Sequence, residues 1–421
     1  MDTQLTKQPT RQPLTRGDRL WASLMDMAAI GAIAGGGSCR LSLTNEDKLA
    51  RDLFANWARE AGCGVHVDRY GNMFGIRPGR LSNAPIVLVG SHLDTQPHGG
   101  RFDGVLGVLA GLEVIRALND AGIETDHPIA VVNWTNEEGV RFKPGLTGSK
   151  GFVGDLDAAS LQGTEGADYF AELERIGYAG DPNLRLNVLC YYELHIEQGP
   201  SLEQERARVG VVAGVQGVRW FEIDIAGKDA HAGTTPIVAR SDSFMAASAL
   251  AIALRQSAIS LSPDLRFTIG RVEVSPNSTN TVPGRTRLFI DLRHTDPAIM
   301  DAFKQTMAHV IERVSAQEHV QASVSQLMDV APVRFDTEMQ ARLAACAHAL
   351  EVLAPTLESG AMHDASSLAS VVPTAMLFVQ SRDGISHNPR EWSEPGHVAT
   401  ACEILAQAVL SHAIGSMPEH T

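Results

Sequence analysis

The chain carries PIVLVGSHLDTQPHGGRFDG at residues 85–104. The apolar, β-branched run at residues 85–90 is typical of a buried strand in a mainly parallel sheet. From Val105 to Leu118 apolar side chains recur at helical spacing, and Gly122 follows where a C-terminal glycine cap belongs. A second apolar run occupies residues 129–134. This order predicts a β-loop-α-β unit and therefore an α/β fold.

Imidazole and carboxylate side chains follow both apolar runs. His92 and Asp94 come after the first run, and Glu137 and Glu138 come after the second. In open α/β sheets ligands bind beyond the carboxyl ends of the strands, which is where these side chains emerge. Such groups suit zinc, and also manganese, cobalt or nickel. One histidine among the 15 in the chain would be weak evidence, because most histidines are surface or core residues. The joint pattern predicts a metal site.

The length of 421 residues favours two domains, since it exceeds what one hydrophobic core usually serves. From about residue 214 the pattern predicts the order β-α-β-β-α-β of a ferredoxin-like sandwich. These elements are expected at residues 219–226, 243–257, 267–274, 287–293, 297–314 and 320–327. Further elements, which resume the first domain, are expected at residues 339–353, 374–379 and 397–413. We predict a flexible tail at 1–20, a discontinuous α/β domain at 21–213 and 329–421, and an inserted domain at 214–328.

The net charge and the cysteine content indicate which kinds of partner and which cellular compartment to expect. The formal net charge of −14 argues against nucleic acid or an anionic membrane, which reward clustered lysine and arginine. The five cysteines are scattered without a CxxC pair, as free thiols in a reducing cytoplasm would be. The start lacks the layout of a signal peptide, and the apolar residues 25–39 fall short of the roughly 20 that span a bilayer. We expect a cytoplasmic protein with no nucleic-acid or membrane partner.

A series of longer motifs runs along nearly the whole chain after the tail. They are GSHLDT at 90–95, GGRFDG at 99–104, NEEGVRF at 136–142, ELHIEQGP at 193–200, AHAGTTP at 230–236, NTVPG at 280–284, DLRH at 291–294, HDA at 363–365 and SHNPRE at 386–391. In this order they resemble the hydantoinase/carbamoylase branch of the dinuclear-metal aminoacylase and carboxypeptidase superfamily. The resemblance implies a metallopeptidase-like catalytic domain, with an inserted ferredoxin-like domain for dimerisation that also acts as a lid. It therefore implies a homodimer.

The resemblance also implies how two divalent ions are held. One ion is expected on His92, Asp103 and His195. The other is expected on Asp103, Glu138 and His387, so that Asp103 bridges the pair. As plain sequence, Asp103 would be an N-cap of the following helix, a role compatible with metal binding.

Two further acidic residues are assigned catalytic roles. Asp94 stands two residues after His92, so on an extended segment both face one side, and we expect the Asp94 carboxylate to hydrogen-bond the His92 imidazole. Glu137 and Glu138 are adjacent and point in different directions, so one can bind metal while the other faces the substrate. The resemblance makes Glu137 the general base, which takes a proton from water and passes it to the departing nitrogen. The alternative is a solvated acidic pair at a strand end.

Four residues are expected to contact the substrate. Arg293 matches the family arginine that grips a carboxylate, and Asn280 matches an asparagine beside it, although they could be a surface arginine and a turn residue. His231 matches the histidine that stabilises the oxyanion, often across the dimer. Gln198 matches a glutamine near the ureido group, to which its amide can both donate and accept. Met362 stands where the branch commonly has glycine, which is expected to narrow or reshape the substrate pocket.

These residues together predict a metal-dependent amidohydrolase that cleaves a linear C–N bond of a ureido acid. An N-carbamoyl-L-amino acid is the first choice of substrate. Allantoate amidohydrolase and β-ureidopropionase share these residues and remain alternatives. A peptidase or deacylase of the same superfamily is disfavoured by HIEQGP and AHAGTTP. An inactive protein that only binds ureido acids is disfavoured by the intact Glu137 and metal ligands.

Overall fold

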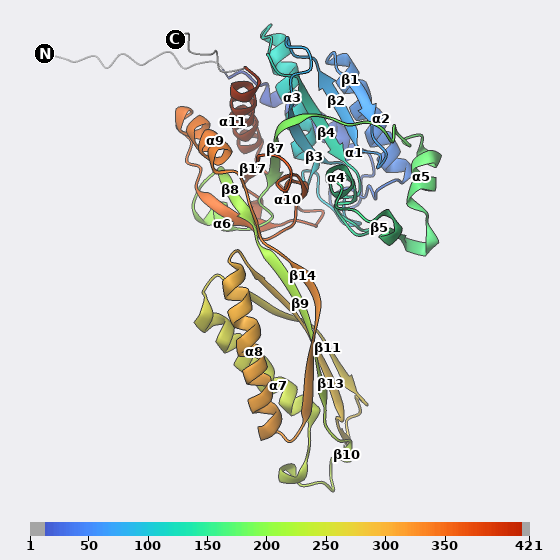
Figure 1. Ribbon diagram of the computed structural model, residues 1–421, viewed down its shortest axis with the longest axis vertical. Coiled ribbons are helices and arrows are strands. Elements are labelled where there is room, and N and C mark those ends of the chain that lie inside the picture. Colours follow the sequence, from blue (N-terminus) through green and yellow to red (C-terminus); the bar gives the residue numbers. More distant parts are fainter. Residues whose placement is uncertain (1–12, 415–421) are drawn as a thin grey trace, which may run out of the picture. The chain divides into compact units, whose positions relative to one another are not determined.

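The computed structural model describes residues 13–414, and this part of the chain divides into two units (Figure 1). One unit holds residues 13–213 and 335–414, and the inserted unit is Gly214–Arg334. The insertion predicted at 214–328 ends earlier than this unit. The reason is that β14 (Gln321–Val330) and β15 (Val333–Arg334) carry the chain beyond residue 328 before it leaves the unit.

The tail predicted at residues 1–20 is wrong in its last part. Helix α1 (Gly17–Ala29) begins within that range, and its Leu20, Leu24 and Met27 are fully buried. Their spacing of three and four residues places them on one face of the helix, which packs into the core. Just before the helix, the backbone N–H and hydroxyl of Thr15 both donate to a carboxylate oxygen of Glu403. Residues 1–12 lie outside the described residues.

The first unit is built on one mixed sheet. Its strand order is β1-β2-β4-β3-β7-β17-β8, and β16 also pairs with β8. The bounds are β1 Gly64–Val67, β2 Met73–Arg77, β3 Ile86–His92, β4 Ile129–Trp134, β7 Val188–Ile196, β8 Val209–Val215, β16 Thr356–Ser359 and β17 Thr374–Val379. The four strands in the middle, β4, β3, β7 and β17, are parallel. Their carboxyl ends therefore meet at one edge of the sheet, where the sequence predicted a site.

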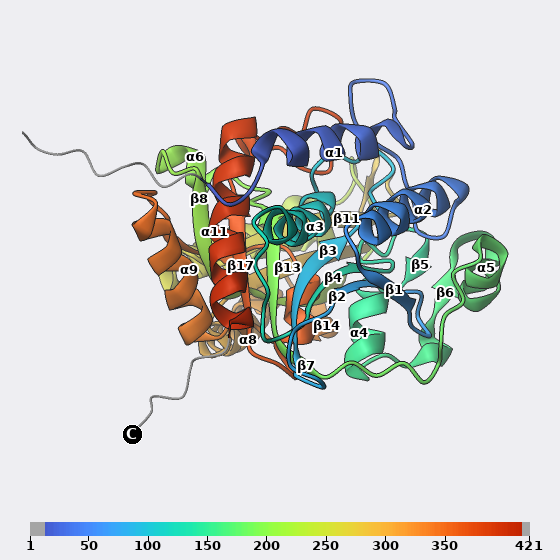
Figure 2. The same ribbon diagram turned by 90° about the horizontal axis from the view of Figure 1, so that it is seen from above.

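Helices cover both faces of this sheet. The helices that share the main hydrophobic core are α1, α2 (Asn45–Glu60), α3 (Val105–Asp120), α9 (Thr337–Ala349) and α11 (Pro395–Ala413). Figure 2 shows α1, α3 and α11 side by side over the strands. The short helices α4 (Thr147–Val153) and α10 (Asp364–Leu368) pack on each other and on β4, β7 and β17. The other α-helices and strands of this unit are α5 Tyr169–Ile176, α6 Ser201–Gln204, β5 Phe142–Lys143 and β6 Gln162–Gly163.

Alternation along β7 assigns each side chain to one face. Cys190, Tyr192, Leu194 and Ile196 point into the main core, so the residues that alternate with them, including Glu193 and His195, face the side of α4 and α10. The helix predicted after the opening loop is α3, and it ends as expected. Gly122 has a φ of 62°, and the next backbone N–H reaches back to the carbonyl of Leu118 at 2.9 Å.

The inserted unit has the predicted order of elements. Its elements are β9 Gly217–Ala226, α7 Ser243–Leu261, β11 Arg266–Ser275, β13 Arg285–His294, α8 Pro297–Gln317 and β14. The sheet order is β11-β13-β9-β14 with all neighbours antiparallel, and both helices pack on the sheet. A small ribbon of β10 (Ala230–His231) and β12 (Thr281–Val282) is added beyond the end of β9. This is the split βαβ arrangement.

Helix α7 is long and apolar enough to cross a membrane by composition, the one such helix among residues 13–414. That is weak evidence for a span, since core helices of globular domains meet the same criteria. Its Leu250 and Leu254 are fully buried in the core of the inserted unit. On its other side Met245, Ile252 and Ile259 are exposed.

Candidate metal centre

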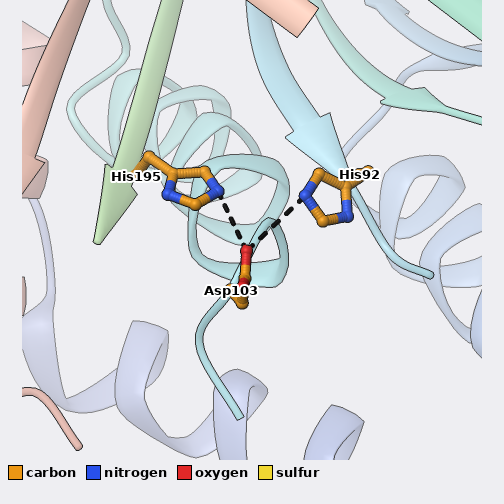
Figure 3. A group of neighbouring side chains, drawn as sticks. All are labelled: His92, Asp103 and His195. Carbon is orange, nitrogen blue, oxygen red and sulfur yellow. Dashed lines mark ion pairs between the residues drawn. The ribbon is translucent and has the colours of Figure 1, made fainter. Parts of the chain in front are cut away.

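Three side chains of the first unit converge beyond the ends of β3 and β7 (Figure 3). His92 is the last residue of β3, His195 is the second last of β7, and Asp103 stands in the loop before α3. The Oδ1 atom of Asp103 lies 3.1 Å from Nε2 of His195 and 3.7 Å from Nε2 of His92. All three residues are buried. The N-cap of α3 is Gly104, and no side chain caps this helix, so the carboxylate of Asp103 is directed to the histidines and not to the helix.

The other oxygen of Asp103 belongs to a second group. Its Oδ2 lies 3.2 Å from Nε2 of His387, and that nitrogen lies 3.6 Å from Oε2 of Glu138. Within each group of three the potential ligand atoms all lie within 4.8 Å of one another. The structure thus brings together the five residues that the sequence selected, in two groups that share Asp103.

Hydrogen bonds fix which nitrogen of each buried histidine faces Asp103. Nδ1 of His92 lies 2.9 Å from the carbonyl oxygen of Asp94, and Nδ1 of His195 lies 2.9 Å from that of Ile196. A carbonyl only accepts, so both Nδ1 atoms carry the proton. Nε2 of His92 is then left with its lone pair directed at the group, as in a metal-binding histidine held by an outer hydrogen bond. Nε2 of His195 faces the same group, where the backbone N–H of Gly104 also lies 3.2 Å from it.

The electrostatics of the two groups also fit divalent cations. The ion-pair partners of Asp103 and Glu138 are histidines. Burial lowers the pKa of His92 to about 4, so its ring is neutral. The hydrogen bond to Asp103 raises the pKa of His387 to about 9 and, against the effect of burial, that of His195 to about 9. Burial and then the charge of Asp103 raise the pKa of Glu138 to about 8. Within the described chain, the buried Oε1 of Glu138 has no hydrogen-bond partner. Buried carboxylates need a matching cation, and bound metal ions would take the place of the protons on these histidines.

Asp94 does not hold His92 in the way that the sequence predicted. Its Oδ1 lies 3.8 Å from Nδ1 of His92, too far for a hydrogen bond, and the ring donates to the Asp94 backbone carbonyl instead. The carboxylate accepts the backbone N–H groups of Glu137 at 3.2 Å and of Glu138 at 3.3 Å. The prediction missed this because the partners of the carboxylate come from the loop after the neighbouring strand, β4. Asp94 therefore positions the pair of glutamates.

Glu137 lies beside the first group. Its Oε2 is 3.6 Å from Nε2 of His92, and its side chain is only 10% exposed. Burial, followed by the charges of Asp364 and Glu138, raises the pKa of Glu137 well above its usual range. The residue before it, Asn136, has a φ of 58°, a left-handed conformation that is uncommon outside functional sites and turns. This backbone turns the chain directly after β4 and places Glu137 against the histidine.

Gln198 contacts both Asp103 and the segment of His387. Its Nε2 donates to Oδ2 of Asp103 at 3.0 Å and to the hydroxyl oxygen of Ser386 at 3.2 Å. Its buried Oε1 has no hydrogen-bond partner in the part of the chain that the structure describes. The backbone of Gln198 is also left-handed, with a φ of 58°. The side chain therefore keeps one acceptor available beside the two groups.

Comparisons with known proteins agree with this geometry. The model of peptidase family M20/M25/M40 matches residues 88–411. The chain belongs to this family. An N-carbamoyl-L-amino-acid amidohydrolase of Rhizobium meliloti is 40% identical over 96% of this chain and 98% of its own length. An allantoate amidohydrolase of Bacillus subtilis is 32% identical over 87% of this chain and 90% of that protein.

Among solved structures, an amidase of the hydantoinase/carbamoylase family from Burkholderia multivorans is similar to this chain. It is 44% identical with a TM-score of 0.91, over 96% of this chain and 99% of that one. The predicted resemblance to the hydantoinase/carbamoylase branch and the predicted α/β, metallopeptidase-like fold are thus confirmed.

Three residues selected from the family motifs lie in the inserted unit, where the structure brings two of them together and places the third apart from them. His231 pairs with Thr281 in the β10–β12 ribbon, and the N–H after it donates to the carbonyl of Asn280, so these two are neighbours. Arg293 stands near the far end of β13, opposite Val218 at the start of β9. Its guanidinium donates twice to Asp291, at 2.9 Å each. Within one chain Arg293 does not lie with His231 and Asn280.

Sequence reasoning missed some buried acidic residues beside the M20-family site. Glu193 accepts the Ser91 hydroxyl at 2.7 Å and the Ala365 backbone N–H at 2.7 Å, so it ties the end of β3 to the start of α10. It stands two residues before His195, and this same-face spacing is a signal that could have identified it. Asp364 is fully buried and contributes to the raised pKa of Glu137. No spacing in the sequence marks Asp364.

Proposed function

We propose that this protein is a metal-dependent amidohydrolase that hydrolyses a linear C–N bond of a ureido acid. The preferred reaction converts an N-carbamoyl-L-amino acid and water to the L-amino acid, ammonia and carbon dioxide. The observation that carries the proposal is the pair of ligand groups that share Asp103, with Glu137 beside them. The relatives named as amidohydrolases over nearly the whole chain support a hydrolase of C–N bonds other than peptide bonds.

The cofactor in this proposal is a pair of divalent metal ions, zinc or, in its place, manganese, cobalt or nickel. His92 and His195 would hold one ion, Glu138 and His387 the other, and Asp103 both. When bound, such a pair lowers the pKa of water and polarises a carbonyl group. The Nε2 lone pair of His92 and the unpartnered Oε1 of Glu138 support this choice of ligands.

Glu137 is the proposed general base and later the general acid. Its raised pKa makes it a ready proton acceptor, and its place against His92 is next to the ligands. It takes a proton from the attacking water and delivers it to the departing nitrogen. Asp94 contributes by fixing the backbone of Glu137 and Glu138 through two N–H groups.

The substrate contacts follow from the available polar atoms. The unpartnered Oε1 of Gln198 can accept an N–H of the ureido group. Arg293 is proposed to bind the substrate carboxylate with a bidentate guanidinium, which Asp291 already holds in a fixed plane. Asn280 is proposed to contact the same carboxylate, and His231 to stabilise the oxyanion.

A homodimer is part of the proposal. The exposed Met245, Ile252 and Ile259 repeat every seven residues, so they form one apolar stripe along α7. Strand β14 is an edge of its sheet and exposes Val324 and Leu327. A second copy would cover such surfaces. A dimer would also allow the separated Arg293 and His231 to act on one small substrate from different subunits.

Allantoate is the second candidate substrate, because the Bacillus subtilis relative named for it is 32% identical. β-Ureidopropionate remains a third. A cytoplasmic location is proposed from the cysteines, which are free and partly or fully buried.

An assay that follows both ammonia and free amino acid tests the function, because acylated and peptide substrates release no ammonia. Metal-free protein is restored with zinc, manganese, cobalt or nickel and offered N-carbamoyl amino acids, allantoate, β-ureidopropionate, N-acetyl amino acids and dipeptides. We expect turnover of N-carbamoyl-L-amino acids that depends on added metal. Turnover of the acylated or peptide substrates alone would contradict the proposal, and so would binding of ureido acids without turnover.

A further inference from the structure

Glu391 is a buried carboxylate that contacts two ligand-bearing segments of the site. Its Oε1 accepts the backbone N–H groups of Phe102 at 3.0 Å and of Asp103 at 3.2 Å. Its Oε2 lies 3.1 Å from the hydroxyl of Ser386. The side chain is 2% exposed. One carboxylate therefore bonds the backbone of Asp103 and the residue directly before His387.

The hydroxyl of Ser386 can donate its hydrogen bond to either of two carboxylates. It lies 3.2 Å from Oδ2 of Asp103 and 3.1 Å from Oε2 of Glu391, and it has one proton to donate. When it donates to Glu391, the Oδ2 atom of Asp103 keeps a lone pair for a cation. Glu391 thus affects the oxygen of Asp103 that faces His387 and Glu138, and not the oxygen that faces His195.

The loop before Asp103 leaves room for this carboxylate. A Cβ atom on Gly100 would come within 2.0 Å of both Cδ and Oε1 of Glu391 and within 2.5 Å of its Cβ. Any side chain at position 100 would displace Glu391 as a whole, because the clash includes the base of its side chain. The position of Glu391 therefore depends on the absence of a side chain at Gly100.

We propose that Glu391 is a positioning residue that holds Asp103 and His387 in register and thereby sets the affinity of the cation shared by Asp103, Glu138 and His387. The inference rests on the proposed dinuclear centre. It concerns the second ion alone, since the first ion uses Oδ1 of Asp103 with His92 and His195. Removing such an outer partner of a metal ligand typically lowers affinity about 10- to 100-fold.

The substitution Glu391→Gln makes the test specific. The amide can keep the two backbone N–H bonds through its oxygen, but its nitrogen then donates to Ser386, whose proton must turn to Asp103. The matched control is Glu403→Gln, because Glu403 is also buried and accepts a backbone N–H and a hydroxyl, those of Thr15. Gly100→Ala is the independent variant, which displaces Glu391 without removing any charge.

The measurement is zinc binding to the metal-free proteins in competition with a chromophoric chelator, with thermal unfolding followed in parallel. We expect two ions per chain in the wild type. In Glu391→Gln, which can keep the two backbone N–H bonds, the second-ion affinity should be about 10- to 100-fold weaker with the first ion unchanged. In Gly100→Ala, which also frees the backbone of Asp103, the second-ion affinity should fall at least as far. Glu403→Gln should bind both ions like the wild type. In Glu391→Gln, an unchanged second-ion affinity or an equal loss of both ions would overturn the inference. A wild type that binds fewer than two ions would overturn the dinuclear centre together with it.

Discussion

Mixing two impaired variants, His231→Ala and Arg293→Ala, is expected to restore activity. Along β13, the eight steps from Arg285 to Arg293 (293 − 285) cover about 27 Å at about 3.4 Å per residue. Arg285 pairs with Ala226 at the end of β9, and His231 lies beyond that end. A ureido acid is much shorter than this span. If both residues serve one substrate, they must come from different subunits.

The size of the recovery follows from the symmetry of a dimer. Random exchange of subunits makes half of the dimers mixed, and each mixed dimer has one site with both residues intact and one with neither. The mixture should therefore reach about a quarter of the wild-type kcat/KM. Each variant alone should retain about 1% or less if its residue stabilises the transition state.

The assay is ammonia release at a substrate concentration below the KM, from two co-expressed variants that carry different tags. The unselected mixture should reach about a quarter of the wild-type value, and mixed dimers isolated through both tags should reach about half. Mixing each variant in turn with Glu137→Ala then shows which residue comes from the partner, because only that combination recovers. Activity of the mixture at the level of its parents would refute the reasoning, as would full activity of either variant alone.

Three further predictions concern single substitutions. Glu137→Ala should lower kcat by about 10²- to 10⁴-fold with the metal content unchanged, and loss of metal would show that the roles of Glu137 and Glu138 were exchanged. Met362 is 42% exposed, so Met362→Ala should leave thermal stability nearly unchanged. The same substitution should raise kcat/KM for bulky N-carbamoyl amino acids by about tenfold or more. An unchanged preference between bulky and small substrates would show that Met362 does not line the pocket. Burial lowers the pKa of His412 from 6.5 to about 4, and its Nδ1 lies 2.7 Å from the hydroxyl of Tyr192. The unfolded chain therefore takes up a proton at a higher pH than the folded chain, so the free energy of unfolding falls as the pH drops from about 6.5 to 4. In His412→Gln, urea unfolding should show a smaller decrease of this free energy across the same pH range; an equal decrease would contradict the assignment.

The elements that the sequence predicted well are those with a clear apolar period. Strands β4 and β17 and the start of α8 lie where the pattern placed them. Helix α1 was assigned to the tail because its polar and proline-containing surroundings hide the spacing of Leu20, Leu24 and Met27, and burial against α3 and α11 decides its structure. Strand β7 was not predicted, since Glu193 and His195 interrupt its apolar run on the face that carries the site.

The site was predictable where a residue type itself indicates chemistry. Histidines and acids after strand ends, combined with family motifs, selected the two groups that the structure brings together. Asp94 was selected as a supporting residue, but its partners, and the role of Glu391, were not predictable, because both carboxylates bond backbone N–H groups, which nearly every residue offers. Their partners are far away in sequence, 288 residues between Glu391 and Asp103. Only the fold reveals such pairs.

Anomalous diffraction from crystals soaked in manganese or zinc tests the central claim most directly, because it locates the ions on the residues themselves. The account predicts two peaks per chain about 3.5 to 4 Å apart, one between His92 and His195 and one between Glu138 and His387, with Asp103 between them. A single peak, or peaks that do not contact Asp103, would contradict it.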